Sequence, residues 1–222
     1  LARNEAHNIV ECLQSLQPYV EEMLLIDMES DDNTMELSRP LVSKVLTHPL
    51  VDNFDPARNI ATEHAQHDWL WFLDADERVP ASVGEVVRDL VRKHGDKYAA
   101  INIPFRSYFC GRWIKHCGWW PGYTMPRVLK RGHFRFAEKL HGGVEVDGPQ
   151  LRVSAEPDLA IEHYSYRSVE HYVEKFNRYT STEARQLASQ GQAFEWSEAT
   201  RHMIRELWNY YEHHSGHQDG EQ

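Results

Sequence analysis

The order of apolar and polar positions predicts alternating strands and helices over the first hundred residues. Short apolar runs predict strands, and apolar residues at helical spacing predict amphipathic helices. The expected strands are residues 23–26, 42–47 and 69–73, and the expected helices are residues 5–17, with Asn4 as N-cap, 56–66 and 83–91. Alternation of this kind is typical of an α/β fold with an open sheet.

The second half of the chain changes character at Ser168. Before it, short strands are expected at residues 98–104, 123–130, 134–136, 144–146 and 158–164. After it, two apolar stripes at helical spacing predict helices that pack against the body of the protein, one through Tyr172, Phe176 and Tyr179 and one through Trp196, Thr200, Met203, Leu207 and Tyr211. We therefore expect a main domain over residues 1–166, a helical extension over 167–212 and a frayed polar tail over 213–222.

An acidic cluster, Asp74 to Glu77, follows the apolar run of residues 69–73. Such a run predicts a strand buried on both faces, which would place the cluster at the carboxyl edge of a sheet, where open α/β sheets bind ligands. Asp74 and Asp76 would then project to the same side and offer two oxygen donors to a divalent cation. In the other interpretation, Asp76 is a turn former that caps a helix opened by Pro80.

Composition restricts the class of protein further. The 222 residues are 41% hydrophobic, enough for one large domain with an ordinary core. Three cysteines, Cys12, Cys110 and Cys117, fit neither a disulfide framework nor a zinc site, so we expect free thiols and a cytoplasmic location. No apolar run approaches the roughly 20 residues that cross a bilayer, which leaves only peripheral contact with the inner face of the membrane open.

Charge is distributed unevenly along the chain. The net charge of −10 argues against general affinity for nucleic acid. Between Arg106 and Lys139, however, eight Lys or Arg residues face one acid, Glu138, which gives this segment a charge of +7. The segment also contains Trp113, Trp119, Trp120 and Tyr123. Cations among aromatic rings suit an anionic ligand with an apolar face, such as a sugar phosphate, and a solvated basic surface is the alternative.

Several short motifs occur in a fixed order along residues 1–182. They are Arg3-Asn4-Glu5, the loop Asp27–Thr34, Arg58-Asn59, Leu73-Asp74-Ala75-Asp76-Glu77, Gly111–Ile114, Gly118–Pro121, Arg127–Arg131, Leu140-His141, His163–Tyr166 and Phe176–Thr180. Together they resemble the family 2 glycosyltransferases of the GT-A fold, particularly the branch that builds lipopolysaccharide core sugars. Two positions depart from the family pattern, because Glu29 stands at its usual glycine and Gly142 at its usual glutamate.

The resemblance implies a Rossmann-like mixed sheet flanked by helices, with a C-terminal helical extension and with the first strand missing. It also implies inverting transfer of a sugar from a nucleotide-diphosphate donor, such as a UDP-sugar, to a phosphorylated glycolipid or lipopolysaccharide-core acceptor. Mg²⁺ or Mn²⁺ near Asp76 would stabilise the leaving diphosphate, and Asp74 would orient the ribose or the water shell of the metal. The donor-binding residues implied are Asn4, Glu5, Asp27 at the nucleobase, Arg58 at the diphosphate and Asp74.

Inversion needs a group that takes the proton of the acceptor hydroxyl. Because the usual glutamate is absent, Glu138 is the first choice for this base, with Glu145 and Asp147 in reserve. His141 could assist as a base, bind metal or phosphate, or orient a neighbour. The acceptor-binding residues that the resemblance implies are Arg112, Trp113, Trp119, Trp120 and Arg127.

Two further functions compete with this one. Gly142 and Glu29 favour a catalytically silent module that binds a nucleotide sugar without turning it over. A metal-dependent phosphoester hydrolase could also use aspartate and histidine ligands, but those of this chain are not spaced like a dinuclear site.

Overall fold

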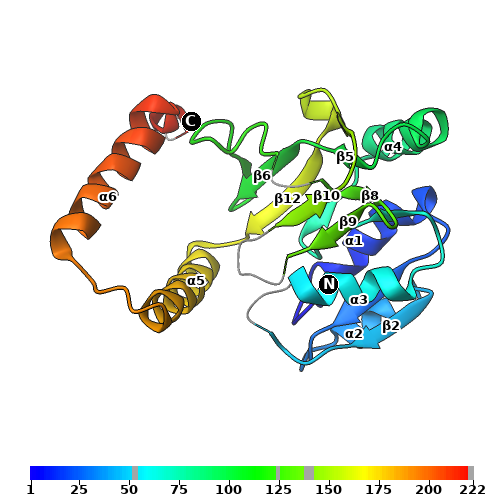
Figure 1. Cartoon of the computed structure of the whole chain (residues 1–222), viewed down its shortest axis with the longest axis horizontal. Coiled ribbons are helices and arrows are strands. Elements are labelled where there is room, and N and C mark those ends of the chain that lie inside the picture. The colour runs from blue at the N-terminus through cyan, green and yellow to red at the C-terminus, as the bar shows by residue number, and fades with distance from the viewer. Residues whose placement is uncertain (52–54, 124–125, 138–142, 220–222) are drawn as a thin grey trace. The chain divides into compact units, whose positions relative to one another are not determined.

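The structure is a computed structural model of the whole chain, and it describes residues 1–51, 55–123, 126–137 and 143–219. The chain forms two compact units (Figure 1). The first unit contains residues 1–105 and 123–163, and the second contains residues 106–122 and 164–222. The aromatic, basic segment 106–122 therefore groups with the C-terminal helices.

The elements alternate as the sequence pattern predicts. In chain order the first unit contains α1 (Ile9–Leu16), a 3₁₀ turn (Gln17–Tyr19), β1 (Leu24–Asp27), α2 (Thr34–Ser38), β2 (Lys44–Thr47), α3 (Asp55–His64), β3 (Trp69–Trp71), β4 (Glu77–Arg78), α4 (Ala81–His94), β5 (Ala100–Asn102), β8 (Val128–Lys130), β9 (Phe134–Phe136), β10 (Val144–Val146), β11 (Gln150–Arg152) and a 3₁₀ turn (Pro157–Leu159). The first helix begins at Ile9, later than expected, because Asn4 has a φ of 55° and does not cap it.

Two parallel strands and a separate four-stranded sheet form most of the first unit. β1 pairs with β2 in parallel, with Leu24 opposite Lys44. The larger sheet has the order β11-β5-β8-β3, in which β8 runs antiparallel to both neighbours. Strands β9 and β10 form a hairpin of their own.

The short strand β4 places the acidic turn beside another strand. β4 pairs antiparallel with β12 (Ile161–Tyr166), so that His163 lies opposite Glu77. Pairing across the chain thus brings residue 163 to the turn that follows β3.

The core of the first unit consists of apolar side chains from α4 and the strands around it. Helix α4 buries Val83 and Val87, in agreement with its predicted stripe, against Ile103, Phe105 and Ile161. A second cluster joins α1 to β1, and a third lies under β9. These clusters hold the ends of β1 and β3 in one compact body.

An apolar cavity of about 360 Å³ lies between α1, β1, β3 and α4. Ala2 forms an isolated parallel bridge with Asp27 at one end, donating its N–H to Ile26 O at 3.0 Å. Strand β3 is paired with β8 on one edge and borders the cavity, so its three residues are only half-buried. The expectation that it is buried on both faces is therefore wrong.

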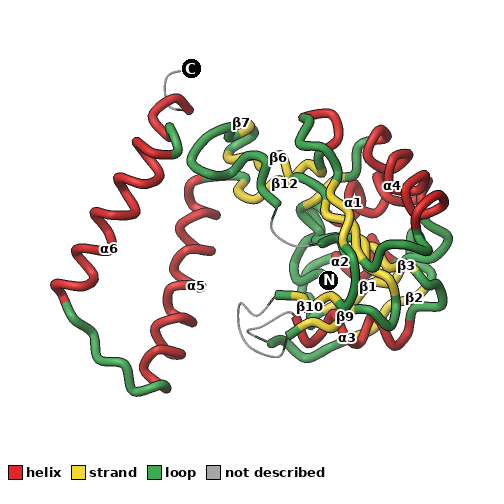
Figure 2. The backbone as a smooth tube through the Cα atoms, turned by 45° about the horizontal axis from the view of Figure 1, so that its top comes forward, coloured by secondary structure: helices red, strands yellow, loops and turns green. Residues whose placement is uncertain are grey.

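The second unit combines two long helices with strands of a four-stranded sheet (Figure 2). Its elements are β6 (Phe105–Phe109), which begins in the first unit, β7 (Arg112–Trp113), the end of β12, α5 (Val169–Ser189), α6 (Trp196–Trp208), a π-helical turn (Asn209–His213) and a 3₁₀ turn (Gly216–Asp219). The order of that sheet is β4-β12-β6-β7, and β6 and β7 pair with Tyr108 opposite Trp113. Ser168 caps α5 by accepting a hydrogen bond from the N–H of His171 at 3.2 Å.

The C-terminal helices do not pack as the apolar stripes predict. Among the described residues, neither α5 nor α6 buries a side chain, and Trp196 is 78% exposed. The apolar stripe of α6 is therefore exposed within the second unit, whereas Tyr172 of α5 contacts Phe109 and Tyr166. No helix in the described part of the chain is long and apolar enough to cross a bilayer.

The tail after α6 folds back instead of fraying. Asp219 accepts a hydrogen bond from the backbone N–H of His116 at 2.9 Å and pairs with the His116 ring at 3.0 Å. His214 O accepts from the N–H of Cys117 at 2.9 Å. Residues up to 219 therefore belong to the second unit, and the three cysteines are free thiols, as expected.

Candidate active site

A loop at the end of β1 carries the first predicted donor residue, Asp27. Its side chain is 2% exposed, and Oδ2 accepts a hydrogen bond from the N–H of Ser30 at 3.1 Å. Oδ1 is buried and has no hydrogen-bond partner among the described residues. Because an unmatched buried acceptor is costly, this oxygen is suited to a donor supplied by a ligand. Glu29 has a φ of 54°, the left-handed conformation that the usual glycine adopts without strain.

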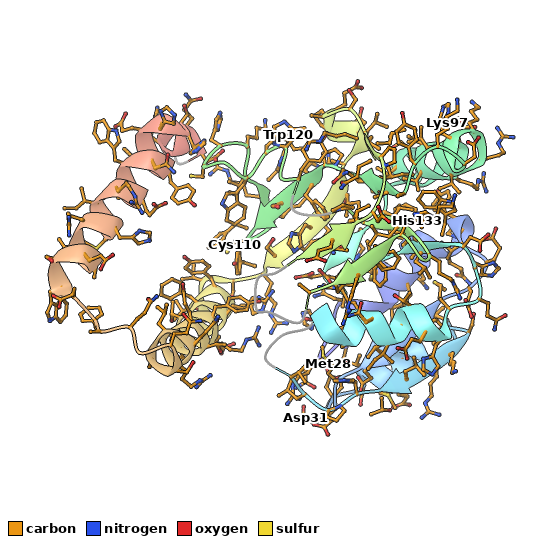
Figure 3. The ribbon with its side chains drawn as sticks, in the orientation of Figure 1. Met28, Asp31, Lys97, Cys110, Trp120 and His133 are labelled. Atoms are coloured by element: carbon orange, nitrogen blue, oxygen red, sulfur yellow. The ribbon has the colours of Figure 1, made fainter. Side chains whose placement is uncertain are left out.

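The other predicted residues near the N-terminus are fastened to the same loop. Asn4 Oδ1 accepts from the N–H of Asp31 at 2.9 Å, and the N–H of Glu5 donates to Thr34 Oγ1 at 2.8 Å. Met28 and Asp31, labelled in Figure 3, mark this loop in the first unit. The structure thus brings Asn4, Glu5 and Asp27 together, as the sequence predicts.

Asp74, the first acid of the Asp-X-Asp motif, is held by two arginines. Its Oδ1 accepts from Arg58 Nη2 at 2.7 Å and its Oδ2 from Arg127 Nη2 at 3.2 Å. Burial alone would raise the pKa of Asp74, but the two guanidinium groups hold it far below its ordinary range. Asp74 therefore stays ionised, and both of its oxygens are committed to protein partners.

Glu77 closes the turn from the other side. Its N–H donates to Asp74 O at 3.0 Å, and its Oε2 accepts from the N–H of Asp74 at 2.9 Å. Its Oε1 pairs with Arg127. The Glu77 side chain is fully buried, and burial together with the neighbouring Asp74 charge raises its pKa to about 7 despite Arg127.

Asp76 faces His163 across the β4–β12 pair. The Asp76 Oδ1 and His163 Nε2 atoms are 3.6 Å apart. Burial acts to lower the pKa of His163, but the Asp76 carboxylate raises it above its ordinary value. No group of three or more histidine, cysteine or acidic residues in the described chain forms a complete metal cage.

Sequence reasoning missed the roles of Glu77 and His163. Glu77 directly follows the Asp74-Ala75-Asp76 motif, and this position was the only sequence signal of its role. His163 lies 87 positions beyond Asp76, and the antiparallel β12 strand brings it back to the motif. The histidine in the motif His163–Tyr166 was the one sequence signal that could have indicated this role.

The predicted catalytic bases cannot be placed in the same way. Glu138 and His141, and also Gly142, lie outside the described residues. The reserve candidates Glu145 and Asp147 are exposed, the first on β10 and the second just after it.

Four of the five predicted acceptor residues lie in the second unit. Trp113 and Trp120 meet edge to face with ring centroids 5.4 Å apart, and Trp120 is labelled in Figure 3. Lys115 Nζ lies 4.9 Å from the Trp113 ring centroid. Arg112 shares β7 with Trp113, and the Trp119 ring is 6.1 Å from that of Tyr166. Cations and indoles are therefore interleaved here.

Arg127 does not join that group. It belongs to the first unit, is 4% exposed and pairs with Asp74 and Glu77. A buried guanidinium that is committed to two carboxylates does not fit an acceptor-binding role.

The fold and this site together define a class of protein. The chain shares its fold with S. aureus TarS, with a TM-score of 0.54 at 14% identity over 74% of this chain and 58% of the TarS chain. An α/β body of this kind, with an Asp-X-Asp turn after a strand, is the GT-A fold of glycosyltransferases.

Comparison with known sequences identifies the family. The chain belongs to glycosyl transferase family 2, whose profile matches residues 1–143. An uncharacterized glycosyltransferase of Rickettsia felis is 25% identical over 92% of this chain and 74% of its own length. The lipopolysaccharide core biosynthesis glycosyltransferase LpsC of Rhizobium meliloti is 22% identical over 85% of this chain and 70% of its own length. The chain is thus a transferase that uses a nucleotide-sugar donor.

Proposed function

We propose that this protein transfers a sugar, with inversion, from a nucleotide-diphosphate donor to a phosphorylated glycolipid acceptor, and that it requires a divalent cation. The turn from Asp74 to Glu77 carries this proposal. Two arginines and Glu77 fix Asp74, and Asp76 lies across from an imidazole. A turn built in this way presents a carboxylate at a defined position beside a strand end, where GT-A enzymes hold their donor.

The side chains at this turn fit a cation of the Mn²⁺ or Mg²⁺ type. Asp76 supplies a carboxylate oxygen and His163 an imidazole nitrogen, and cations of this type take their remaining ligands from substrate phosphates and water. Asp74 does not fit a direct ligand role, because both of its oxygens hold arginines. When bound, the cation would neutralise charge that develops on the leaving diphosphate.

The remaining donor contacts follow from the loop after β1. The unpaired Oδ1 of Asp27 can accept the ring N–H of a uracil base, which supports a UDP-sugar as donor. Asn4 and Glu5 hold that loop in place through Asp31 and Thr34. Arg58 has its Nη2 on Asp74, so we propose that it acts on the donor through this carboxylate.

The acceptor side rests on the interleaved cations and indoles of the second unit. Arg112, Trp113, Trp119 and Trp120 would bind a sugar ring and an adjacent phosphate. The name of LpsC supports a lipopolysaccharide-core acceptor. We propose that the protein acts at the inner face of the membrane. We propose Glu138 as the base that takes the proton of the acceptor hydroxyl, with His141 assisting.

Nucleotide release provides the test. UDP release from a panel of UDP-sugars should require Mn²⁺ or Mg²⁺ and should fall by at least about a hundredfold in the Asp76→Asn variant. Asp89→Asn, which removes a surface carboxylate of α4 paired with Arg92 and Lys93, is the matched control and should retain full activity. Full activity of Asp76→Asn, or in the presence of EDTA, would contradict the metal role. Donor binding by calorimetry without turnover on any acceptor would select the silent binding module.

A further inference from the structure

We propose that Arg127 and Glu77 are positioning residues, which hold the Asp-X-Asp turn in its working shape without touching donor, cation or acceptor. This inference rests on the proposed function, because it assigns the purpose of the turn to presenting Asp76. It replaces the acceptor role that the sequence suggested for Arg127.

Three contacts join Arg127, Glu77 and Asp74 to one another. Arg127 Nη2 lies 3.2 Å from Asp74 Oδ2 and also pairs with Glu77 Oε1. Glu77 Oε2 accepts from the N–H of Asp74 at 2.9 Å. These contacts fix both the side chain and the backbone of Asp74. Asp76 lies between Asp74 and Glu77 in the chain, so the direction of its carboxylate depends on both ends of the turn.

The frame behind Arg127 is rigid. Its N–H donates to Ile101 O at 3.2 Å, and its carbonyl accepts from the N–H of Phe72 at 2.8 Å, which ties residue 127 to the strands on both sides. The guanidinium carbon lies 4.8 Å from the centroid of the buried Phe105 ring. The arginine therefore reaches the turn from the centre of the larger sheet.

The contacts that the two side chains make are directed at the turn. Glu77 is fully buried and Arg127 almost so. A single nitrogen of Arg127, Nη2, makes both carboxylate contacts, whereas Nε and Nη1 are buried without hydrogen-bond partners in the described part of the chain. A lysine, which carries one nitrogen at the end of its stem, can therefore replace the contacts that matter for positioning.

Arg127→Lys and Arg127→Met are the decisive pair of variants. Supports of this kind behind a metal ligand contribute about 10- to 100-fold in metal affinity or activity. In turnover assays we expect Arg127→Met to raise the half-saturating Mn²⁺ concentration and lower kcat within that range. We expect Arg127→Lys to recover most of both losses, and the KM for donor should change less than kcat in either variant.

Two further variants distinguish a loss of positioning from a general loss of stability. Val87→Ala removes buried volume in α4, away from the turn, and should melt earlier but keep the wild-type Mn²⁺ dependence. Glu77→Gln keeps an acceptor for the N–H of Asp74 but removes the charge that pairs with Arg127, so it replaces Arg127→Met if that variant does not fold.

Hydrogen–deuterium exchange gives a readout that needs no turnover. The N–H groups of Asp74 and Glu77 are hydrogen-bonded across the turn, and they should exchange faster in Arg127→Met than in Val87→Ala at equal stability. Unchanged exchange at these amides, wild-type Mn²⁺ dependence of Arg127→Met, or equal loss in Arg127→Lys and Arg127→Met would each overturn the proposal. If the wild type shows no turnover but the exchange difference is present, the proposed function fails and the support for the turn stands.

Discussion

Replacing the two acids of the Asp-X-Asp motif one at a time should distinguish the residue that stabilises the fold from the residue that acts in catalysis. Asp74→Asn removes a carboxylate that accepts charged hydrogen bonds from Arg58 at 2.7 Å and from Arg127 at 3.2 Å. Asp76→Asn removes a carboxylate whose contact with His163 spans 3.6 Å. We expect the first variant to lose stability before any ligand is added and the second to lose mainly activity.

The magnitude for Asp74 follows from these contacts. A hydrogen bond to a charged group contributes about 1.5–3 kcal/mol to stability. Asparagine at position 74 keeps one acceptor oxygen for one of the two arginines, but it presents N–H donors to the guanidinium group of the other. The side chain of Asp74 is 33% exposed and Glu77 remains beside Arg127, so we reduce the sum of the two contacts to about 3 kcal/mol. For a chain of this size that corresponds to a Tm lower by about 6–12 °C. For Asp76→Asn we expect a loss below about 1 kcal/mol.

Thermal unfolding followed by circular dichroism, without divalent cation or nucleotide, measures both values. The reasoning is refuted if Asp74→Asn melts with the wild type, because its arginine contacts would then contribute nothing. It is equally refuted if Asp76→Asn is the less stable of the two. A Tm gain on adding Mn²⁺ and UDP that is present in Asp74→Asn and absent in Asp76→Asn would complete the separation.

Three further predictions test other parts of the molecule. Phe136→Ala should cost about 3–5 kcal/mol in urea unfolding, because the fully buried ring packs against its neighbours under β9, and a loss under 1 kcal/mol would contradict that packing. Maleimide at pH 8 should label exposed Cys110 first and leave Cys12 unlabelled until the protein is denatured, as mass spectrometry would show, because burial raises the pKa of Cys12 to about 12 and removes its thiolate. Burial acts to raise the pKa of Asp219, but hydrogen bonds from His116 lower this pKa below its ordinary value. The contact should therefore stabilise the tail at a pH above the ordinary carboxyl pKa of about 4, and this stabilisation should be lost as the pH falls below that value. Tryptophan fluorescence should record that loss, and Asp219→Asn should abolish the transition.

Local patterns predicted most of the elements of the first unit. The stripe of Val83 and Val87 predicted α4, and the apolar run of residues 23–26 predicted β1, because each segment has a clear apolar pattern. The strands at 134–136 and 144–146 were also found where expected. The two-residue strands β4 and β7 were missed, because so few residues carry no periodic signal. Helix α2 and strands β6 and β11 were not predicted either.

Long-range pairing explains the rest. His163 meets Asp76, and Arg127 meets Glu77, because antiparallel strands return from distant parts of the chain. The resemblance implied an acceptor-binding role for Arg127, yet the fold buries its side chain against Asp74 and Glu77. The stripe on α6 predicted burial, but amphipathic spacing states only that a helix has an apolar face, not that this chain supplies a surface to cover it.

The cavity between β1 and β3 also affects how this chain behaves in a concentrated sample. It is bordered by β3, which among the described residues pairs with β8 alone, and most of its lining is apolar. Unpaired strand edges are templates for hydrogen bonding with another chain. Self-association through the second edge of β3 would therefore increase with protein concentration. For anyone purifying this chain, the second edge of β3 is the place to introduce a lysine.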